Sequence, residues 1–345
     1  MELYIAIPLF IVALIFVIKG GDIFVDASIK IANKCKIPAI IVGATIVSVA
    51  TTLPELIVSI TASAQGSFDL AIGNAIGSVI CNTSLVCGIS LAFAPIFIKN
   101  KTSPLKSYLL LFTILLMGIM SIGIESGQAS GFINIFEGAL LLILFIVYMF
   151  TNIMDAKKEI KDRLEYEKLY NKEHETNHQA IPTNTRESLT KLIILFLLGA
   201  TMVALGAIGL VESAKAIAYA LNISEAVVGF TIVAIGTSLP ELVTTITSLR
   251  KKNNTLGYGN IIGANILNMT LICGTSACIS GSAGLPINFW TLVVSIPVAL
   301  VACSLFVLPM TIKQRTYRWQ GISLIALYIA YLAFIAIMTF NGVSI

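Results

Sequence analysis

Hydrophobic residues along this chain gather in long stretches that short polar segments separate. About 20 consecutive apolar residues span the hydrocarbon core of a bilayer. Ten stretches reach roughly this length: residues 3–19, 38–63, 70–97, 105–124, 130–152, 189–210, 224–249, 257–280, 287–309 and 319–340. The first and sixth are expected to continue as helix to residues 33 and 221. The pattern predicts an all-α membrane protein with ten transmembrane helices.

Composition agrees with a membrane protein. Of the 345 residues, 57% are hydrophobic and 12% are charged, whereas soluble domains carry about 25% charged residues. The N-terminal stretch lacks the positive region and the cleavage site of a signal peptide, so we expect it to remain as a helix. A nucleic-acid partner would need a soluble basic face, which this pattern does not offer; the expected surroundings are a lipid bilayer.

The distribution of basic residues predicts an orientation. With an external N-terminus, the predicted inner loops hold 20 of the 22 lysines and arginines. Cytoplasmic loops of membrane proteins carry such an excess. We therefore expect a multi-pass protein of the plasma (inner) membrane, with both termini external and the 153–188 loop cytoplasmic.

The sequence contains an internal duplication. Residues 42–61 align with residues 228–247 at an offset of 186, and 12 of these 20 positions are identical. The same offset pairs residues 73–88 with 259–274, each beginning Gly-Asn. Chance similarity between apolar helices would not repeat T-x-L-P-E and G-N-x-I-G in the same order.

The duplication predicts two inverted repeats. Each copy has five predicted spans, so the second enters the membrane upside down, as in many secondary transporters whose sites lie at the midplane. We expect a first five-helix repeat at 1–152, a cytoplasmic linker at 153–188 and a second repeat at 189–345. The repeated motifs occupy 43–88 and 229–274.

Two carboxylates stand inside apolar stretches, Glu55 in the second and Glu241 in the seventh. An intramembrane charge costs at least ~2.5 kcal/mol, so such a residue is functional by default. A protonated glutamate bonded to a neighbouring helix is the structural alternative. Two glutamates at equivalent repeat positions favour a paired cation site.

Oxygen-bearing groups surround both glutamates in the sequence. Pro54 and Pro240 are expected to kink their helices and to free carbonyls one turn earlier. Hydroxyls occur in the same turns, and hard cations prefer oxygen ligands. These candidate groups are Thr51, Thr52, Thr237 and Ser238, with carbonyls near Ser48–Ala50 and Ala234–Gly236.

The third and eighth stretches are expected to face this site. Their Gly-x-x-x-Gly patterns allow close helix packing. Ser78, Asn82 and Asn268 could complete a coordination shell or hold the glutamates by hydrogen bonds. We interpret Asn74 and Asn260 as structural.

The paired T-[TS]-L-P-E and G-N-x-x-G-x-x-x-x-N segments resemble the two alpha repeats of the sodium/calcium exchanger family, within the cation/calcium antiporter superfamily. The resemblance to prokaryotic members implies antiport of Na⁺ against Ca²⁺ by alternating access, without an organic cofactor. It implies ion binding by Glu55 and Glu241, by the neighbouring hydroxyls, and by the carbonyls of Ser48 and Ala234.

Two positions depart from the family pattern. Ala264 stands where the first repeat has Ser78, which removes one hydroxyl ligand and bears on the number or affinity of bound Na⁺. Asn82 and Asn268 end both motifs, whereas some members have an acid at one of these positions. Two core carboxylates remain, and these balance one Ca²⁺ or two Na⁺.

Other functions remain open from the residues. Proton-coupled Ca²⁺ exchange is the nearest alternative, although its branch usually carries an acid at the positions of Gly77 and Gly263. An intramembrane enzyme would need a catalytic pair, but Asp22 aligns with Ile208; a channel is a third possibility. The six cysteines lack C-x-x-C spacing and are interpreted as packing residues. Protein partners are not indicated.

Overall fold

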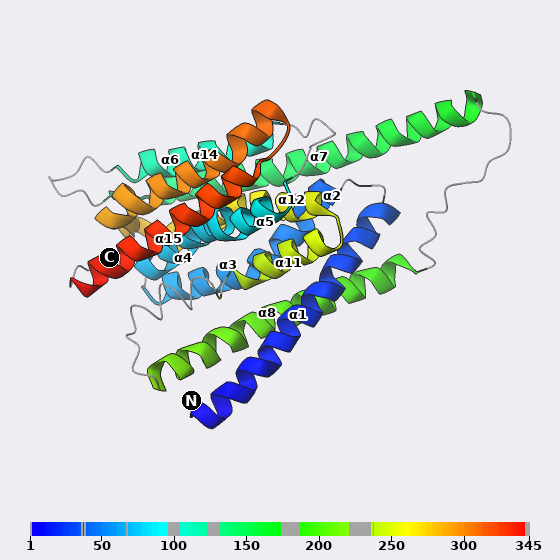
Figure 1. The fold of residues 1–345 in the computed structure, drawn as a ribbon. Coiled ribbons are helices and arrows are strands. Elements are labelled where there is room, and N and C mark those ends of the chain that lie inside the picture. The colour runs from blue at the N-terminus through cyan, green and yellow to red at the C-terminus, as the bar shows by residue number, and fades with distance from the viewer. Residues whose placement is uncertain are drawn as a thin grey trace.

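The structure is a computed structural model that describes residues 2–35, 37, 39–66, 68–95, 104–122, 131–173, 187–220, 236 and 238–341. It is nearly all helical, as Figure 1 shows. Within these residues, eight helices are long and apolar enough to cross a membrane, and a shorter apolar helix covers Ser107–Met120. The chain is therefore a multi-pass membrane protein of the predicted all-α class.

Seven spans or parts of spans are single helices. They are α1 (Leu3–Lys34), α6 (Pro104–Met120), α7 (Ile135–Glu173), α8 (Leu189–Ala220), α11 (Leu239–Arg250), α14 (Ile296–Lys313) and α15 (Arg318–Phe340). The expected extension of the first and sixth stretches is confirmed by α1 and α8. The α7 helix continues past the proposed boundary at residue 152, so the first part of the 153–188 segment is helical.

Three other spans change helix type along their length. Each contains a π-helical turn, in which backbone bonds run to the fifth residue back. The second span is α2 (Ala39–Val42), η1 (Gly43–Val47) and α3 (Ser48–Ala64). The third is α4 (Phe68–Ile80), η2 (Cys81–Val86) and α5 (Cys87–Phe93), and the eighth is α12 (Asn254–Leu267), η4 (Asn268–Ile272) and α13 (Cys273–Ser280). A further π turn, η6 (Thr291–Ser295), precedes α14, and a 3₁₀ turn, η5 (Gly281–Ala283), follows α13.

A short ribbon joins the two halves at one end of the bundle. Strand β1 (Gly131–Ile133) precedes α7, and β2 (Leu285–Ile287) precedes η6 and α14. They pair antiparallel, with Phe132 opposite Pro286. The ribbon therefore connects a loop of one half with a loop of the other.

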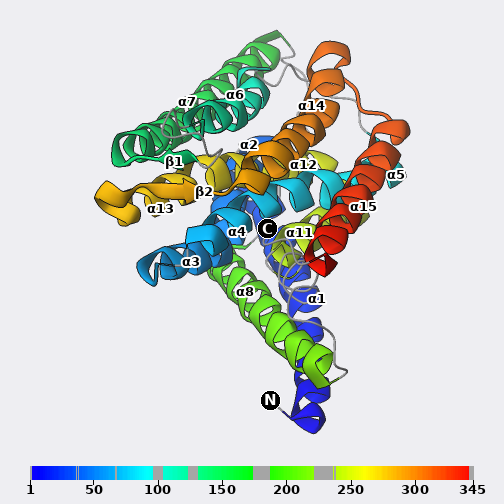
Figure 2. The same ribbon diagram turned by 90° about the vertical axis from the view of Figure 1, so that its left-hand side faces the viewer.

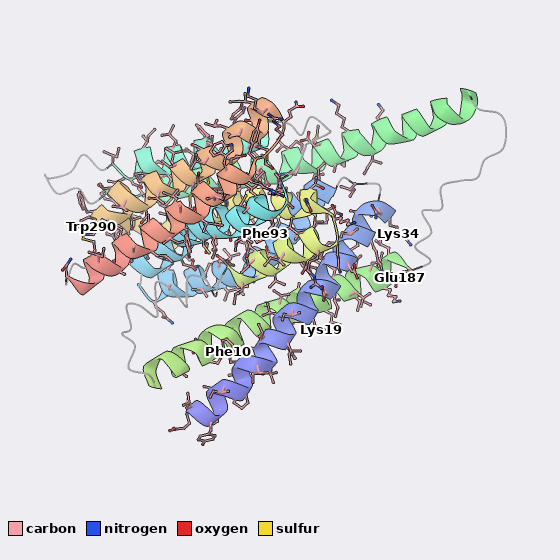
Figure 3. All side chains as sticks on the ribbon, viewed as in Figure 1. Phe10, Lys19, Lys34, Phe93, Glu187 and Trp290 are labelled. Atoms are coloured by element: carbon pink, nitrogen blue, oxygen red, sulfur yellow. The ribbon has the colours of Figure 1, made fainter. Side chains whose placement is uncertain are left out.

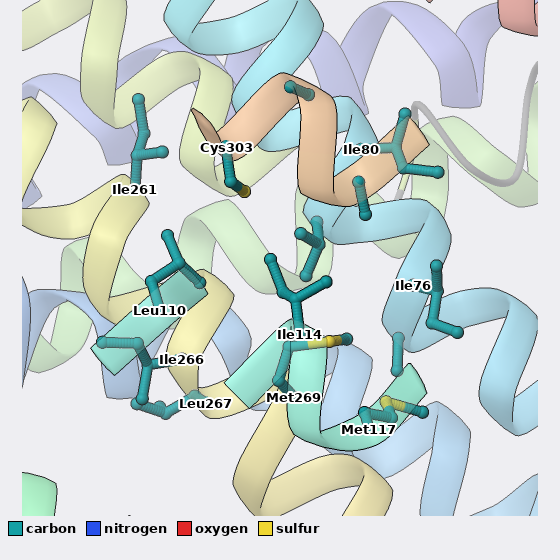
Figure 4. Packing of buried hydrophobic residues seen from close by; sticks show 14 of the residues in the cluster. Ile76, Ile80, Leu110, Ile114, Met117, Ile261, Ile266, Leu267, Met269 and Cys303 are labelled. Atoms are coloured by element: carbon teal, nitrogen blue, oxygen red, sulfur yellow. The ribbon is translucent and has the colours of Figure 1, made fainter. Parts of the chain in front are cut away.

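The α12 span lies at the centre of the molecule, and 83% of its apolar window is buried. The largest hydrophobic cluster joins α4, α6, α12 and α14, and Figure 4 shows Ile76, Ile114 and Ile266 among its side chains. The six cysteines are free, and Cys81, Cys87, Cys273 and Cys303 are buried. We call the described helices other than α1 and α8 the core.

Helices α1 and α8 form a separate pair beside the core, which Figure 2 shows from a second direction. Small residues bring their backbones together: a Cβ at Gly199 would lie 2.6 Å from the nitrogen of Phe24, and one at Gly206 would lie 2.9 Å from the oxygen of Ala13. Glycine at such positions is typical of close membrane-helix packing. The pair therefore behaves as one structural unit.

Ion pairs connect α1 and α8 at one end of this unit, where α1 ends and α8 begins. Lys30 Nζ on α1 lies 2.9 Å from Glu187 Oε2, and Lys191 Nζ lies 3.0 Å from Glu187 Oε1. Bonds from Lys30 and then Lys191 lower the pKa of the Glu187 carboxyl to about 2. Figure 3 shows Lys34 beside Glu187, where its ammonium donates to the backbone oxygen of Glu187.

One lysine ties α1 to the core. Lys251 Nζ, just after α11, lies 2.7 Å from Asp26 Oδ1 and donates to the backbone oxygen of Asp22 over 2.9 Å. Gly21 lies in the same region, because a Cβ there would meet Val243 Cγ1 on α11 at 2.2 Å.

Reversing the charge of Lys251 is expected to loosen α1 from α11. Lys251→Asp would place two carboxylates together, whereas adding Asp26→Lys would restore opposite charges. Exposed ion pairs contribute little to stability, so we expect a nearly unchanged melting temperature but faster alkylation of Cys35, half-buried at the end of α1. Cys278 on α13 is the internal control in detergent-solubilised protein. Equal Cys35 alkylation in the wild type and the single variant would contradict this tether.

Candidate cation site

The two intramembrane glutamates lie on helices that contact each other. Glu55 is in the middle of α3 and Glu241 is in the first turn of α11, and both side chains are 0% exposed. Their carboxyl groups are close enough to interact electrostatically. Residues 186 positions apart in the sequence therefore meet in the buried interior.

The local backbone of the first half contains a π turn before Pro54. Helix α3 continues through Pro54, and the departure from α geometry is the π turn η1, which ends immediately before Ser48. Proline removes the donor for the carbonyl four residues earlier, and α3 accommodates this loss without a break. The kink expected at Pro54 stays a prediction, and the structure adds a π turn about two turns earlier.

In the second half, α11 begins at Leu239 with Pro240 in its first turn, where a missing backbone donor costs nothing. The side chain of Ser238 is 1% exposed and directly precedes this helix. The predicted ligands Ala234 and Thr237 lie outside the described residues. The candidate site can thus be followed fully on α3 and from Ser238 onward on α11.

Hydroxyls of the first half reach groups of the second. Thr52 Oγ1 donates to Glu241 Oε1 over 3.4 Å. Thr51 Oγ1 lies 3.2 Å from Asn260 Oδ1 and 3.3 Å from the backbone oxygen of Ser48. The two threonines therefore connect α3 with both α11 and α12.

The third and eighth spans, which were expected to face the site, contain π turns at nearly equivalent positions in both halves. Ser78 lies near the end of α4, and Asn82 lies in η2; Asn268 begins η4. All three side chains are buried, as is the methyl group of Ala264. Helix α3 contacts η4 and α11 contacts η2, so each glutamate helix packs against the π turn of the other repeat.

Several buried oxygens here have no hydrogen-bond partner among the described residues. Burying an oxygen without a partner is costly, and such an oxygen can instead coordinate a cation. Seven belong to predicted ligands: both carboxylate oxygens of Glu55, Oε2 of Glu241, the amide oxygens of Asn82 and Asn268, and the hydroxyls of Ser78 and Ser238. Ca²⁺ takes six to eight oxygen ligands, so the donor type fits a hard cation.

No group of three or more His, Cys, Asp or Glu side chains that could hold a metal occurs in the described part of the chain. The acidic contribution to this site is therefore the pair Glu55 and Glu241, with neutral oxygens around them. Such a donor set favours Ca²⁺ or Na⁺ over metals that prefer imidazole or thiolate ligands.

The asparagines that follow the first glycine of each motif, Asn74 and Asn260, differ in their contacts. Asn74 Nδ2 donates to the backbone oxygen of Glu55 over 3.1 Å and to Ser59 Oγ over 2.9 Å, which links α4 to α3. Asn260 instead accepts the bond from Thr51, and its Nδ2 has no partner among the described groups. Asn260 thus lies closer to the candidate ligands than its purely structural interpretation implied.

Sequence reasoning missed a polar contact next to Asn82. Asn265 Nδ2 on α12 donates to Thr83 Oγ1 over 2.7 Å, and Thr83 Oγ1 lies 3.4 Å from Cys303 Sγ. The repeat alignment contained a signal, because Asn265 corresponds to Val79 and Thr83 to Met269. Buried polar residues that replace apolar ones in one repeat alone indicate a polar contact that the other repeat lacks.

Comparison with known proteins identifies relatives of this chain. The profile of the family described as sodium/calcium exchanger protein matches residues 5–154 and 191–337. The chain is 34% identical over 331 residues to an uncharacterised membrane protein of Methanocaldococcus jannaschii, covering 96% of this chain and 98% of that protein. It is 30% identical over 342 residues to the sodium/calcium exchanger MaX1 of Methanosarcina acetivorans, covering 93% and 96%.

The fold has a close counterpart among solved structures. The sodium-calcium exchanger NCX_Mj, soaked with 10 mM Na⁺ and no Ca²⁺, matches with a TM-score of 0.79 and 29% sequence identity over 96% of this chain and 99% of that one. The sequence profile and the structural match each extend over most of the chain. This multi-pass membrane protein belongs to the sodium/calcium exchanger family.

Proposed function

We propose that the chain exchanges Na⁺ for Ca²⁺ by alternating access and that Glu55 and Glu241 bind both ions. The observation that carries this proposal is the buried carboxylate pair, in which Glu241 accepts a bond from Thr52. Oxygens without hydrogen-bond partners among the described residues surround the pair. Family membership supports Na⁺/Ca²⁺ antiport, and the proton-coupled alternative is not favoured. The further proposed ligands are Thr51, Thr52, Thr237, Ser238, Ser78, Asn82, Asn268, and the carbonyls of Ser48 and Ala234.

Charge balance gives the exchange its physical basis. Two ionised carboxylates in a buried site are unfavourable unless a cation compensates them. One Ca²⁺ or two Na⁺ would neutralise the pair, so both ions compete for the same oxygens. Any further Na⁺ would need neutral ligands, and Ala264 supplies no hydroxyl at the position equivalent to Ser78.

The α1–α8 pair is the proposed moving element. It carries none of the proposed ligands, and it meets the core through two small hydrophobic clusters, one of them around Ala13 and Val17. We propose that a neutral site permits this pair to slide past the core and that a charged one opposes the movement. The proposed orientation places both termini outside the plasma membrane, and the proposed repeats are 1–152 and 189–345.

A flux experiment tests this function. Purified protein in Na⁺-loaded proteoliposomes is expected to accumulate ⁴⁵Ca²⁺ when it is diluted into Na⁺-free buffer, and K⁺-loaded vesicles serve as the control. The outward Na⁺ gradient supplies the driving force, so collapsing it with a Na⁺ ionophore should stop uptake. Uptake that ignores the Na⁺ gradient and follows a pH gradient would contradict the proposal.

A further inference from the structure

A buried tyrosine outside the repeat motifs bonds to the backbone of the proposed site helix. Tyr148 on α7 is 0% exposed, and its hydroxyl donates to the backbone oxygen of Ala44 over 2.7 Å. Ala44 lies in the π turn η1, four residues before Ser48. The backbone oxygen of Tyr148 accepts a bond from Asn152 Nδ2 over 2.8 Å, which braces α7 at the same place.

The second repeat has a tyrosine at the equivalent position, but its hydroxyl has another partner. Gly138 on α7 packs against Gly274, and Gly321 on α15 packs against Gly88, so the two helices correspond at an offset of 183, which pairs Tyr148 with Tyr331. A buried phenol hydroxyl needs a partner, and that of Tyr331 lies 3.1 Å from Ser295 Oγ. Among the described contacts, Tyr148 therefore bonds to the backbone of a proposed site helix, whereas its counterpart bonds to a side chain outside the site.

Tyr148 and α12 hold the η1 turn together. A Cβ at Gly263 on α12 would lie 2.8 Å from the oxygen of Ala44 and 2.5 Å from Ser48 Oγ, so α12 packs directly against this segment. A π turn contains one residue more than the α turn that it replaces. If it relaxed to α geometry, the following residues would change their angular position by about 100° each, which would move the oxygens of Thr51, Thr52 and Glu55.

We propose that Tyr148 is a positioning residue that fixes the η1 turn and thereby the first-repeat half of the cation site. This inference rests on the proposed function, because it takes Ser48 to Glu55 as ion ligands. The hydroxyl prepares this half for Ca²⁺ before the ion arrives. Removing the hydroxyl leaves every ligand residue in the protein, but Ca²⁺ binding must then order the η1 turn. The cost of this ordering weakens the Ca²⁺ affinity more than it changes the maximal transport rate.

The test removes the hydroxyl of Tyr148. Tyr148→Phe removes one hydroxyl and leaves the packing volume nearly unchanged. Loss of a supporting bond behind metal ligands typically costs 10–100-fold in affinity, so we expect the half-saturating Ca²⁺ concentration to rise about tenfold. The maximal ⁴⁵Ca²⁺ uptake rate should change much less. The melting-temperature increase on adding Ca²⁺ should require correspondingly more Ca²⁺, because ligand stabilisation follows its concentration relative to Kd.

A matched tyrosine provides the control. The Tyr331 hydroxyl lies 3.1 Å from Ser295 Oγ at the end of η6, and neither residue is a proposed ligand. Tyr331→Phe therefore makes the same chemical change beside another π turn and should leave the Ca²⁺ affinity unchanged. Placing 3-fluorotyrosine at position 148 keeps the hydroxyl and should retain wild-type affinity, even if the Phe variant folds poorly.

The outcomes separate this inference from the proposed function. A Ca²⁺ affinity of Tyr148→Phe within twofold of the wild type, or an equal loss in Tyr331→Phe, would overturn the positioning role. Ca²⁺-dependent stabilisation that weakens only in Tyr148→Phe supports it. If the wild type failed to couple Ca²⁺ uptake to Na⁺, the proposed exchange function would be contradicted. The melting-temperature measurement with added Ca²⁺ would still test the role of Tyr148.

Discussion

Glu55→Gln and Glu241→Gln are each expected to reduce Na⁺-driven ⁴⁵Ca²⁺ uptake by at least about 100-fold. Each carboxylate pairs with the buried cation, and removing one partner of a buried ion pair costs about 3–5 kcal/mol, where each 1.4 kcal/mol corresponds to a factor of ten in affinity. One positive charge of Ca²⁺ would also be left without a balancing carboxylate. Uptake into Na⁺-loaded proteoliposomes, with the same amount of reconstituted protein, measures the loss.

The two variants should differ in stability without ions. Glu55 has no hydrogen bond to lose among the described residues, whereas Glu241 accepts a bond from Thr52. We therefore expect Glu55→Gln to melt at or above the wild-type temperature in ion-free buffer, and to gain nothing when Ca²⁺ is added. Full exchange activity in both variants would rule out this pair as the cation site.

Glu137 offers a matched control for these substitutions. It lies in the first turn of α7, where its Oε2 accepts a bond from the backbone nitrogen of Asn134 over 2.8 Å. Asn134 and Glu137 form a reciprocal helix cap, in which glutamine also functions at the second position. Glu137→Gln should therefore leave both exchange and Ca²⁺ stabilisation nearly unchanged.

Gly263→Ala is expected to disrupt the site by separating two helices. The added methyl would lie 2.5 Å from Ser48 Oγ and 2.7 Å from Ser48 Cβ, distances that require the backbone to move. Overpacking of this kind costs about 1–3 kcal/mol, and here the displaced segment carries Ser48 and the threonines. We expect a lower melting temperature together with loss of most Ca²⁺ binding.

Gly257 on the same helix separates this effect from helix propensity. A Cβ at Gly257 would meet Cα of Thr245 at 3.4 Å, which is an ordinary contact. Gly257→Ala should therefore retain Ca²⁺ binding and gain slightly from the better helix former. Thermal unfolding with and without Ca²⁺ compares the two variants. Equal behaviour would show that α12 does not pack closely on Ser48.

The sequence predicted the helical class and the long α1 and α8 because apolar length is a local property. It also singled out Glu55 and Glu241, since a charge inside an apolar stretch is visible without any structure. The bonds between Thr52 and Glu241 and between Thr51 and Asn260 could not be predicted, because each joins residues about 190–210 positions apart. Their geometry depends on how the repeats pack.

The π turns were missed for a related reason. Pro54 predicts a kink in α3 but gives no indication of η1, where Tyr148 and Gly263 contact Ala44. No residue inside η1 indicates a π turn, so its position depends on tertiary contacts. The contact of Lys251 with Asp22 likewise could not be predicted, because Lys251 binds this part of α1 from a distant segment.

The α1–α8 pair also has a consequence for the lipid around the protein. Only 22% of the apolar window of α1 and 28% of that of α8 are buried, so acyl chains cover most of the remaining surface. If this pair slides during exchange, it must shear the adjacent lipid as well as the core. Membrane viscosity then becomes a frictional term in turnover: stiffer or thicker bilayers should slow the cycle while leaving the ion affinities of the site unchanged.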